Sequence, residues 1–266
     1  MKKIISRKNR IILMEMVRTD FKLRYQNSVL GYLWSLLRPL LLSVTLYIVF
    51  VKFLGIGGDI RHYASYLLLG IMCWTFFIEI TTGGVGAIVG KGDLIRKISI
   101  PRYLPVLSSS FSAIINFGLN FIVLAFIMVL NGVEVQFSLL FLVPLLIVQL
   151  YIFSLSIAFI LSAAYVKFRD VSFIWEVFTQ MFFYITPILY PVSFVIEKYS
   201  FGKYLLLNPL AQIIQGLRNL LVTPQTDTSW GQLGALAIVP IIIVGLLVLY
   251  SVWYFKREAK TFAENV

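Results

Sequence analysis

The chain has 266 residues, of which 59% are hydrophobic and 13% are charged, and its formal net charge is +11. About a quarter of the residues of an average soluble domain are charged. This composition therefore excludes a soluble globular protein and predicts an all-α polytopic membrane protein, with residues 1–266 forming a single transmembrane domain. The basic excess indicates contact with anionic lipid and not with nucleic acid.

Residues 9–26 predict an amphipathic helix that lies in the plane of the membrane interface. On a helical wheel, one side of this helix carries the apolar residues Leu13, Met14, Val17, Phe21 and Tyr25. Arg24 lies near this side, although a long arginine side chain can reach back to lipid headgroups. The alternative is an ordinary cytosolic helix that packs on a partner.

Six apolar runs are long enough to cross a membrane, because a spanning helix needs about 20 apolar residues. They comprise residues 33–53, 63–80, 103–130, 139–166, 171–190 and 233–255. Lysine and arginine concentrate in the N-terminal segment, after the second and fourth runs, and in the C-terminal tail, which places both termini in the cytoplasm. The segments on the outer side keep Lys52, Arg61, Lys198, Lys203 and Arg218.

A short basic helix is predicted at residues 93–98, after the second run. Leu94, Ile95 and Ile98 share one side of it, and Pro101 ends the element. A short, partly apolar helix on the cytoplasmic side needs a partner surface to dock into. The alternative is a solvated basic loop.

The run GGVGAIVGKGD, which leads into this helix, resembles the phosphate-binding pattern G-x-x-x-x-G-K-[ST]. Val85 occupies the position of the first glycine, however, and Gly92 follows Lys91 where the pattern requires Ser or Thr. The sequence shows no other nucleotide-binding fingerprint. If the protein works by ATP hydrolysis, the ATPase must be another chain.

Residues 192–222 contain two apolar pieces, separated by Asn208 and Pro209, that are too short to span a bilayer. They predict two re-entrant or interfacial helices on the outer side. A seventh span would instead move the basic C-terminal tail to the outside, against the positive-inside rule.

Polar residues recur along one side of the third run, at Ser109, Ser112, Asn116 and Asn120. They either hydrogen-bond to neighbouring helices or line a channel. Charges within the runs are few, namely Arg38, Glu79 and Glu176. These charges either orient the cytoplasmic entrance or pair with one another, or they snorkel at helix ends.

Aromatic residues share one side of the fifth run, at Trp175, Phe178 and Phe182. Aromatic faces suit sugar rings, but membrane helices use the same residues for packing. His62 is the only histidine, and the carboxylates are scattered without a close pair or a metal-ligand cluster. The sequence therefore predicts no catalytic residue and no metal site, and it disfavours a membrane enzyme.

Four segments together resemble the permease subunit of type-2 ABC exporters for cell-surface polysaccharides, a group that includes O-antigen, teichoic acid and rhamnose-polysaccharide exporters. They are RYQNSVLGYLWSLLRPL (24–40), DLIRKISIPRYLPVL (93–107), FRDVSFIWEVFTQMFFYITPILYPVS (168–193) and LNPLAQIIQGLRNLL (207–221). The resemblance covers nearly the whole chain. It implies a permease that moves a lipid-linked glycan from the cytoplasmic to the outer side of a bacterial cell membrane.

The resemblance also implies partners and site residues. The permease is expected to pair with a second copy of itself and with two copies of an ATPase that binds ATP and Mg²⁺. A coupling helix seated on the ATPase would comprise Asp93, Leu94, Ile95, Arg96, Lys97 and Ile98. Residues 192–222 would form outer gate helices, and the family's cytoplasmic turn would be Phe168, Arg169 and Asp170. The expected channel aromatics are Tyr32, Trp34, Phe178, Phe182 and Tyr184.

Two alternatives stay open at this point. A type-2 ABC exporter of a drug or small lipid would share the same architecture. An ion-coupled carrier or channel would work without an ATPase, but it would be expected to carry a deep relay of carboxylates and histidines, which this sequence lacks.

Overall fold

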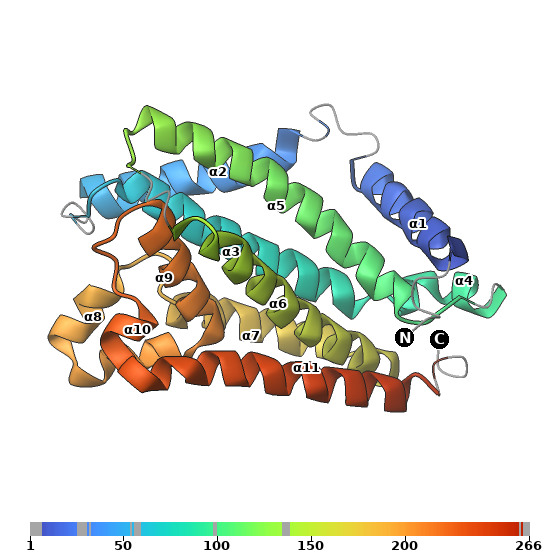
Figure 1. The fold of residues 1–266 in the computed structure, drawn as a ribbon. Coiled ribbons are helices and arrows are strands. Elements are labelled where there is room, and N and C mark those ends of the chain that lie inside the picture. Colours follow the sequence, from blue (N-terminus) through green and yellow to red (C-terminus); the bar gives the residue numbers. More distant parts are fainter. Residues whose placement is uncertain are drawn as a thin grey trace.

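Every regular element in the described part of the chain is a helix (Figure 1). The computed structural model describes residues 7–25, 31, 33–53, 55, 60–97, 100–134, 139–260 and 262. The predicted all-α class is confirmed for these residues. The elements are α1 (Arg7–Tyr25), α2 (Leu33–Tyr47), η1 (Ile48–Phe53), α3 (Tyr63–Val85), η2 (Val89–Lys91), α4 (Gly92–Lys97), α5 (Leu104–Leu130), α6 (Leu142–Lys167), α7 (Val171–Ile185), α8 (Val192–Lys198), η4 (Ser200–Leu207), α9 (Pro209–Leu221), α10 (Ser229–Leu233), η5 (Gly234–Ile238) and α11 (Val239–Glu258).

Within the described residues, five helical stretches are long and apolar enough to cross a membrane, which makes the chain a multi-pass membrane protein. They are Leu36–Phe53, Tyr63–Val85, Leu104–Leu130, Leu142–Lys167 and Ser229–Glu258. The remaining predicted run, 171–190, contains the shorter helix α7 of 15 residues. This helix ends at Ile185 because Thr186 turns to an extended conformation before Pro187, whose ring disfavours a helical preceding residue.

The long helix α3 forms the centre of the bundle. It packs against α5 and α6, and it also contacts α2, α7 and α9. Of its apolar stretch, 72% is buried inside the chain, compared with 11% for Leu36–Phe53. A helix that is apolar on every side suits such a central position. Gly84 permits its closest approach to α6, because a Cβ atom at this position would lie 2.6 Å from the Cβ of Ala158.

Helix α9 is buried among α3, α6, α11 and η4. Its start follows from local chemistry, since the Asn208 side chain accepts a hydrogen bond from the Leu210 amide and Pro209 occupies the first turn. All but two of its thirteen residues are buried, including Arg218. Arg218, which the sequence assigns to an outer segment, is thus fully buried inside the protein.

The region 192–222 divides into three elements and not into the two that were predicted. The break at Asn208 and Pro209 is confirmed, but a second break at the extended residue Tyr199 separates α8 from η4. Whether this region is re-entrant or interfacial stays a prediction.

The two ends of the bundle differ in charge. Helix α4, the start of α1 and the C-terminal ends of α6 and α11 lie at one end, while α8 and α10 lie at the opposite end, here named the far end (Figure 1). The first end, here named the basic end, carries Arg7, Lys8, Lys91, Arg96, Lys97, Lys167, Arg169, Lys256 and Arg257. There the 2.5 Å ion pair between Lys167 and Glu258 joins α6 to α11.

The packing of α3 on α6 predicts a strong effect of Gly84→Leu. The added side chain would overlap Ala158, and overpacking of this kind costs about 1–3 kcal/mol or more. We expect a lower melting temperature and a lower yield of monodisperse protein in detergent. Gly118→Leu is the matched control, because a Cβ atom there meets nothing within 4 Å. Equal losses of melting temperature and yield in both variants would contradict the inference that Gly84 is required for the packing of α3 on α6.

Candidate functional site

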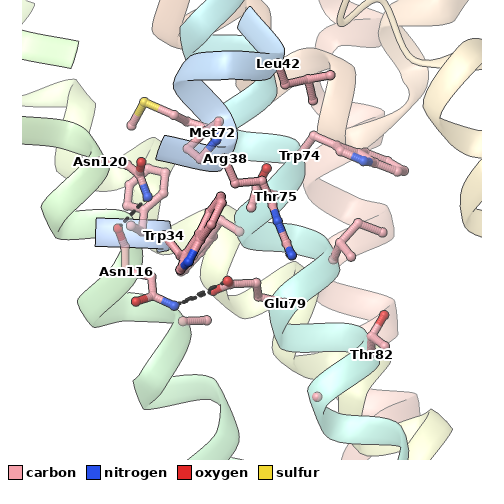
Figure 2. Close-up of a pocket in the computed structure, with 16 residues that line it drawn as sticks. Trp34, Arg38, Leu42, Met72, Trp74, Thr75, Glu79, Thr82, Asn116 and Asn120 are labelled. Carbon is pink, nitrogen blue, oxygen red and sulfur yellow. Dashed lines mark hydrogen bonds between the residues drawn. The ribbon is translucent and has the colours of Figure 1, made fainter. Parts of the chain in front are cut away.

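A cavity of about 920 Å³ lies between α2, α3 and α5 (Figure 2). Trp34 and Arg38 reach it from α2, Trp74 and Glu79 from α3, and Asn116 from α5. Other residues that line it include Leu42, Met72, Thr75, Phe76, Thr82, Phe117 and Asn120. Figure 2 shows Trp34, Arg38 and Glu79 turned toward the same space. Its volume falls within the usual range for small-molecule sites.

The polar side of the cavity is held by hydrogen bonds between α5 and α3 and within α5. The Asn116 Nδ2 atom donates to both carboxylate oxygens of Glu79, at 3.1 and 3.3 Å. The Asn120 Nδ2 atom donates to the backbone oxygen of Asn116 at 2.8 Å. The polar side of α5 therefore does two things that the sequence left as alternatives. It hydrogen-bonds to a neighbouring helix, and it lines a cavity.

The composition of the cavity suits a polar ligand with an apolar face. Arg38 and Glu79 place opposite charges within apolar helices, where charges are costly unless they serve a site or a partner. Trp34 adds an indole that is 47% exposed. Indole, guanidinium, amide and carboxylate groups together can stack on a ring and exchange hydrogen bonds with hydroxyl groups.

The aromatic residues of α7 form a stack beside this cavity. Trp175 and Phe178 have ring centroids 5.2 Å apart, and Phe178 and Phe182 have centroids 5.5 Å apart, with nearly parallel planes. Trp74, which lines the cavity, lies 6.1 Å from Phe182 between centroids. Two predicted channel aromatics, Phe178 and Phe182, are thus brought together.

Of the other three predicted channel aromatics, two are described and neither belongs to this stack. Trp34 lies in the cavity, and Tyr32 is outside the described residues. Tyr184 is 70% exposed and packs edge-on against Phe183. The four described residues of this predicted set are therefore not gathered at one place within a single chain.

Helix α1 packs on α5. Leu13 and Val17 are half-buried, as expected for its apolar side, and Met16 is buried. Met14 is 62% exposed, so the side that meets α5 is rotated from the predicted apolar side toward Met16. The side chains of Phe21, Arg24 and Tyr25 are outside the described set.

An ion pair that the sequence analysis missed connects α1 to the segment before α4. The Asp20 Oδ2 atom accepts hydrogen bonds from Lys91 Nζ at 2.6 Å and from Ser108 Oγ at 2.7 Å. Asp20 follows Met16 by one helical turn, so a carboxylate on the packed side of an amphipathic helix was the available signal. Asp20 and Lys91 also line a smaller cavity of about 250 Å³ with Ser109 and Ser112.

The predicted coupling residues lie on and after α4. Asp93, Arg96 and Lys97 are exposed, and Leu94 is half-buried. Ile95 is 9% exposed and packs into the chain's own core, and Ile98 is outside the described residues. The helix therefore presents charged side chains to its surroundings, while Ile95 anchors it to the protein.

The predicted turn at Phe168, Arg169 and Asp170 joins α6 to α7 at the basic end, and all three residues are exposed. Phe168 ends α6 in an extended conformation, and Asp170 precedes the first turn of α7. The Arg169 guanidinium lies 5.1 Å from the centroid of the Tyr165 ring. The role of this turn stays a prediction.

The family model for ABC-2 type transporters matches residues 13–222. The chain belongs to the ABC-2 type transporter family. This region includes the cavity, the aromatic stack of α7, the helix α4 and the whole of α9.

Relatives of this ABC-2 transporter match it over most of its length. It is 28% identical to an O-antigen export system permease protein, RfbA, of Klebsiella pneumoniae, over 93% of this chain and 94% of the relative. An RfbA protein of Myxococcus xanthus is 27% identical, over 96% and 95%. The polysialic acid transport protein KpsM of Escherichia coli is 24% identical, over 74% and 75%. The predicted resemblance to polysaccharide-export permeases is confirmed.

The bond between Asn116 and Glu79 predicts coupled effects on stability. Asn116→Ala leaves a half-buried carboxylate without this donor, so we expect the free energy of unfolding to fall by about 1–3 kcal/mol. Glu79→Ala should cost less in the Asn116→Ala background than in the wild type. Thermal melting of the four proteins of this double-mutant cycle measures the coupling. Additive losses would show that the two side chains do not stabilise each other.

Proposed function

We propose that this chain is the membrane subunit of an ATP-driven exporter that moves a lipid-linked polysaccharide from the cytoplasmic to the outer side of a bacterial cell membrane. The observation that carries the proposal is that similarity to permeases named for O-antigen export extends over 93–96% of the chain. A shared family segment alone would support only transport in general. The polar, aromatic-lined cavity is consistent with a glycan as cargo.

Two copies of the permease would work together. The exposed face of α7 is strongly apolar and comprises Phe173, Ile174, Val177, Met181 and Tyr184. Arg38 is also exposed on α2, whose apolar stretch is mostly unburied. A charge at this depth is costly against lipid tails. A second copy of the permease would cover the apolar face of α7. A polar path shared between the two copies would give Arg38 a polar environment.

The basic end would face the cytoplasm, in agreement with the positive-inside rule. Two copies of a separate ATPase, with ATP and Mg²⁺, would bind there through α4. Asp93, Arg96 and Lys97 are exposed and are thus available for polar contacts with an ATPase surface. ATP would favour the closed ATPase dimer, and the displacement of α4 would shift the permease toward an open path.

The lipid-linked glycan would enter beside α1. This helix has an exposed side, with Ile11 at 55% and Met14 at 62%, that suits contact with lipid. The region 192–222 at the far end would form the outer gate. This orientation places both termini in the cytoplasm.

Deletion of the gene tests the cargo. We expect surface polysaccharide to be lost and lipid-linked glycan to accumulate inside, with both restored by a plasmid copy of the wild-type chain. Unchanged surface glycan together with new sensitivity to a toxin would instead identify an exporter of a drug or small lipid. Transport by the purified chain without an ATPase would identify an ion-coupled carrier or channel.

Reversal of the charges on α4 tests the docking of the ATPase. For the double variant Arg96→Glu and Lys97→Glu, we expect the amount of copurified ATPase to fall about tenfold or more. The new glutamates would face the groups of the ATPase that had paired with Arg96 and Lys97, and juxtaposed like charges cost several kcal/mol. The amount of inserted permease should not change, since both side chains are exposed. The matched control is Lys256→Glu with Lys260→Glu, two exposed basic residues in the last turn of α11 and just after it. Full retention of the ATPase by the α4 variant would contradict the assignment.

A further inference from the structure

The segment that follows α7 has buried backbone groups that need hydrogen-bond donors. After α7 ends at Ile185, Thr186 and Ile188 are fully buried although the chain is no longer helical. Irregular backbone buried within a membrane protein requires partners from elsewhere in the protein, because unpaired polar groups are costly there. The donors to this segment therefore determine where the end of α7 lies.

Arg218 of α9 provides two of these donors. Its Nη1 atom donates to the Pro187 oxygen at 2.8 Å, and its Nη2 atom donates to the Ile188 oxygen at 2.6 Å. The Nε atom donates to the Tyr66 oxygen of α3 at 3.0 Å, and Nη1 also reaches Gln215 Oε1 at 3.2 Å. One guanidinium group thus joins α9, α3 and the end of α7.

The neighbourhood of Arg218 is shaped around its side chain. The guanidinium carbon lies 3.5 Å from the centroid of the Tyr66 ring, a stacked position that stabilises a cation. Gly70 leaves room for the group, since a Cβ atom there would lie 2.4 Å from Nη2. Tyr63 donates to the next carbonyl, that of Leu189, at 2.6 Å.

The hydrogen-bond partners of Arg218 are neutral carbonyl oxygens. A buried charge is expensive unless it is fully bonded, and here its cost is offset by carbonyls that the end of α7 has left without helical donors. The positive charge also lies near the C-terminal end of α7, where the helix dipole favours a cation. Loss of the guanidinium would therefore leave Pro187, Ile188 and Tyr66 without these donors at the same time.

We infer that Arg218 is a positioning residue that links the outer gate helices to α7 and keeps the far end closed at rest. Helix α7 begins at the exposed turn of the basic end and finishes at the carbonyls that Arg218 holds. A displacement of α7 is thus passed to α9 only while these hydrogen bonds persist. This inference rests on the proposed function, because it assigns 192–222 as the gate.

Cys73 provides a probe of this region that does not depend on transport. It is the only cysteine of the sequence, it is fully buried, and it lies one turn after Gly70 on α3. We would measure its labelling by a polar maleimide in the full-length chain, reconstituted in nanodiscs so that both faces are accessible. Wild-type protein should react slowly without nucleotide.

Arg218→Gln should raise the labelling rate of Cys73 by about tenfold or more, a factor that corresponds to about 1.4 kcal/mol in the opening equilibrium. Gly70→Ala, which keeps the charge but crowds the guanidinium, should do the same. Gly245→Ala is the matched control, because its Cβ atom would meet nothing within 4 Å. Unchanged protection of Cys73 in Arg218→Gln, or equal exposure in the control, would overturn the inference.

A second readout separates positioning from general stability. In the complex with its ATPase, Arg218→Gln should continue to hydrolyse ATP while surface glycan falls, so that the ratio of export to hydrolysis decreases. A merely structural role would lower both activities with the amount of folded protein and leave this ratio unchanged, which would also overturn the inference. If wild-type protein exports no glycan, the proposed function fails, while the thiol measurement still tests the link.

Discussion

Much of the architecture depends on the fact that α7 ends within the membrane-spanning bundle, so that the backbone after it needs hydrogen-bond donors. A helix of 15 residues is about 22 Å long, shorter than a hydrocarbon core of about 30 Å. The chain must continue through irregular backbone, whose carbonyls need protein donors. Arg218 and Tyr63 supply them. This requirement explains why α9 is buried against α3 although it carries a charged residue.

Helix α3 connects the two polar regions of the molecule. Near one end, Tyr66 and Gly70 form the place where Arg218 lies; two to three turns further along, Glu79 lines the cavity with Trp34 and Arg38. Trp74 lies between these regions and contacts Phe182 of α7. Because α3 is a continuous buried helix, a shift of α7 reaches both regions through contacts with the same element. In the proposed exporter, cargo binding and gating would therefore be connected through α3.

Local features of the sequence predicted much of this fold, and features that depend on distant contacts were missed. Hydropathy located the long helices, and Asn208 with Pro209 marked the start of α9, because both signals act within a few residues. The Arg218 network joins residues 152 positions apart, and the Asp20–Lys91 pair joins residues 71 apart. A helical wheel likewise identifies an apolar side but not the neighbour that covers it, which is why the burial of Met16 against the rest of the chain was missed and Ile95 was not recognised as a packing residue.

The Asp20–Lys91 ion pair and the hydrogen bonds of Arg218 differ in strength. This difference bears on where an exporter of this kind would resist opening. Asp20 and Lys91 are partly exposed, with side chains 24% and 22% accessible, and ion pairs of this kind contribute little, about 0–1 kcal/mol at the surface. Arg218 is fully buried, and breaking its bonds would leave a buried guanidinium and the carbonyls of Pro187 and Ile188 without these partners. Breaking the Asp20–Lys91 pair therefore costs less than breaking the Arg218 network at the far end. In the proposed exporter, the basic end would therefore respond to the ATPase while the Arg218 network keeps the far end in place until α7 itself moves.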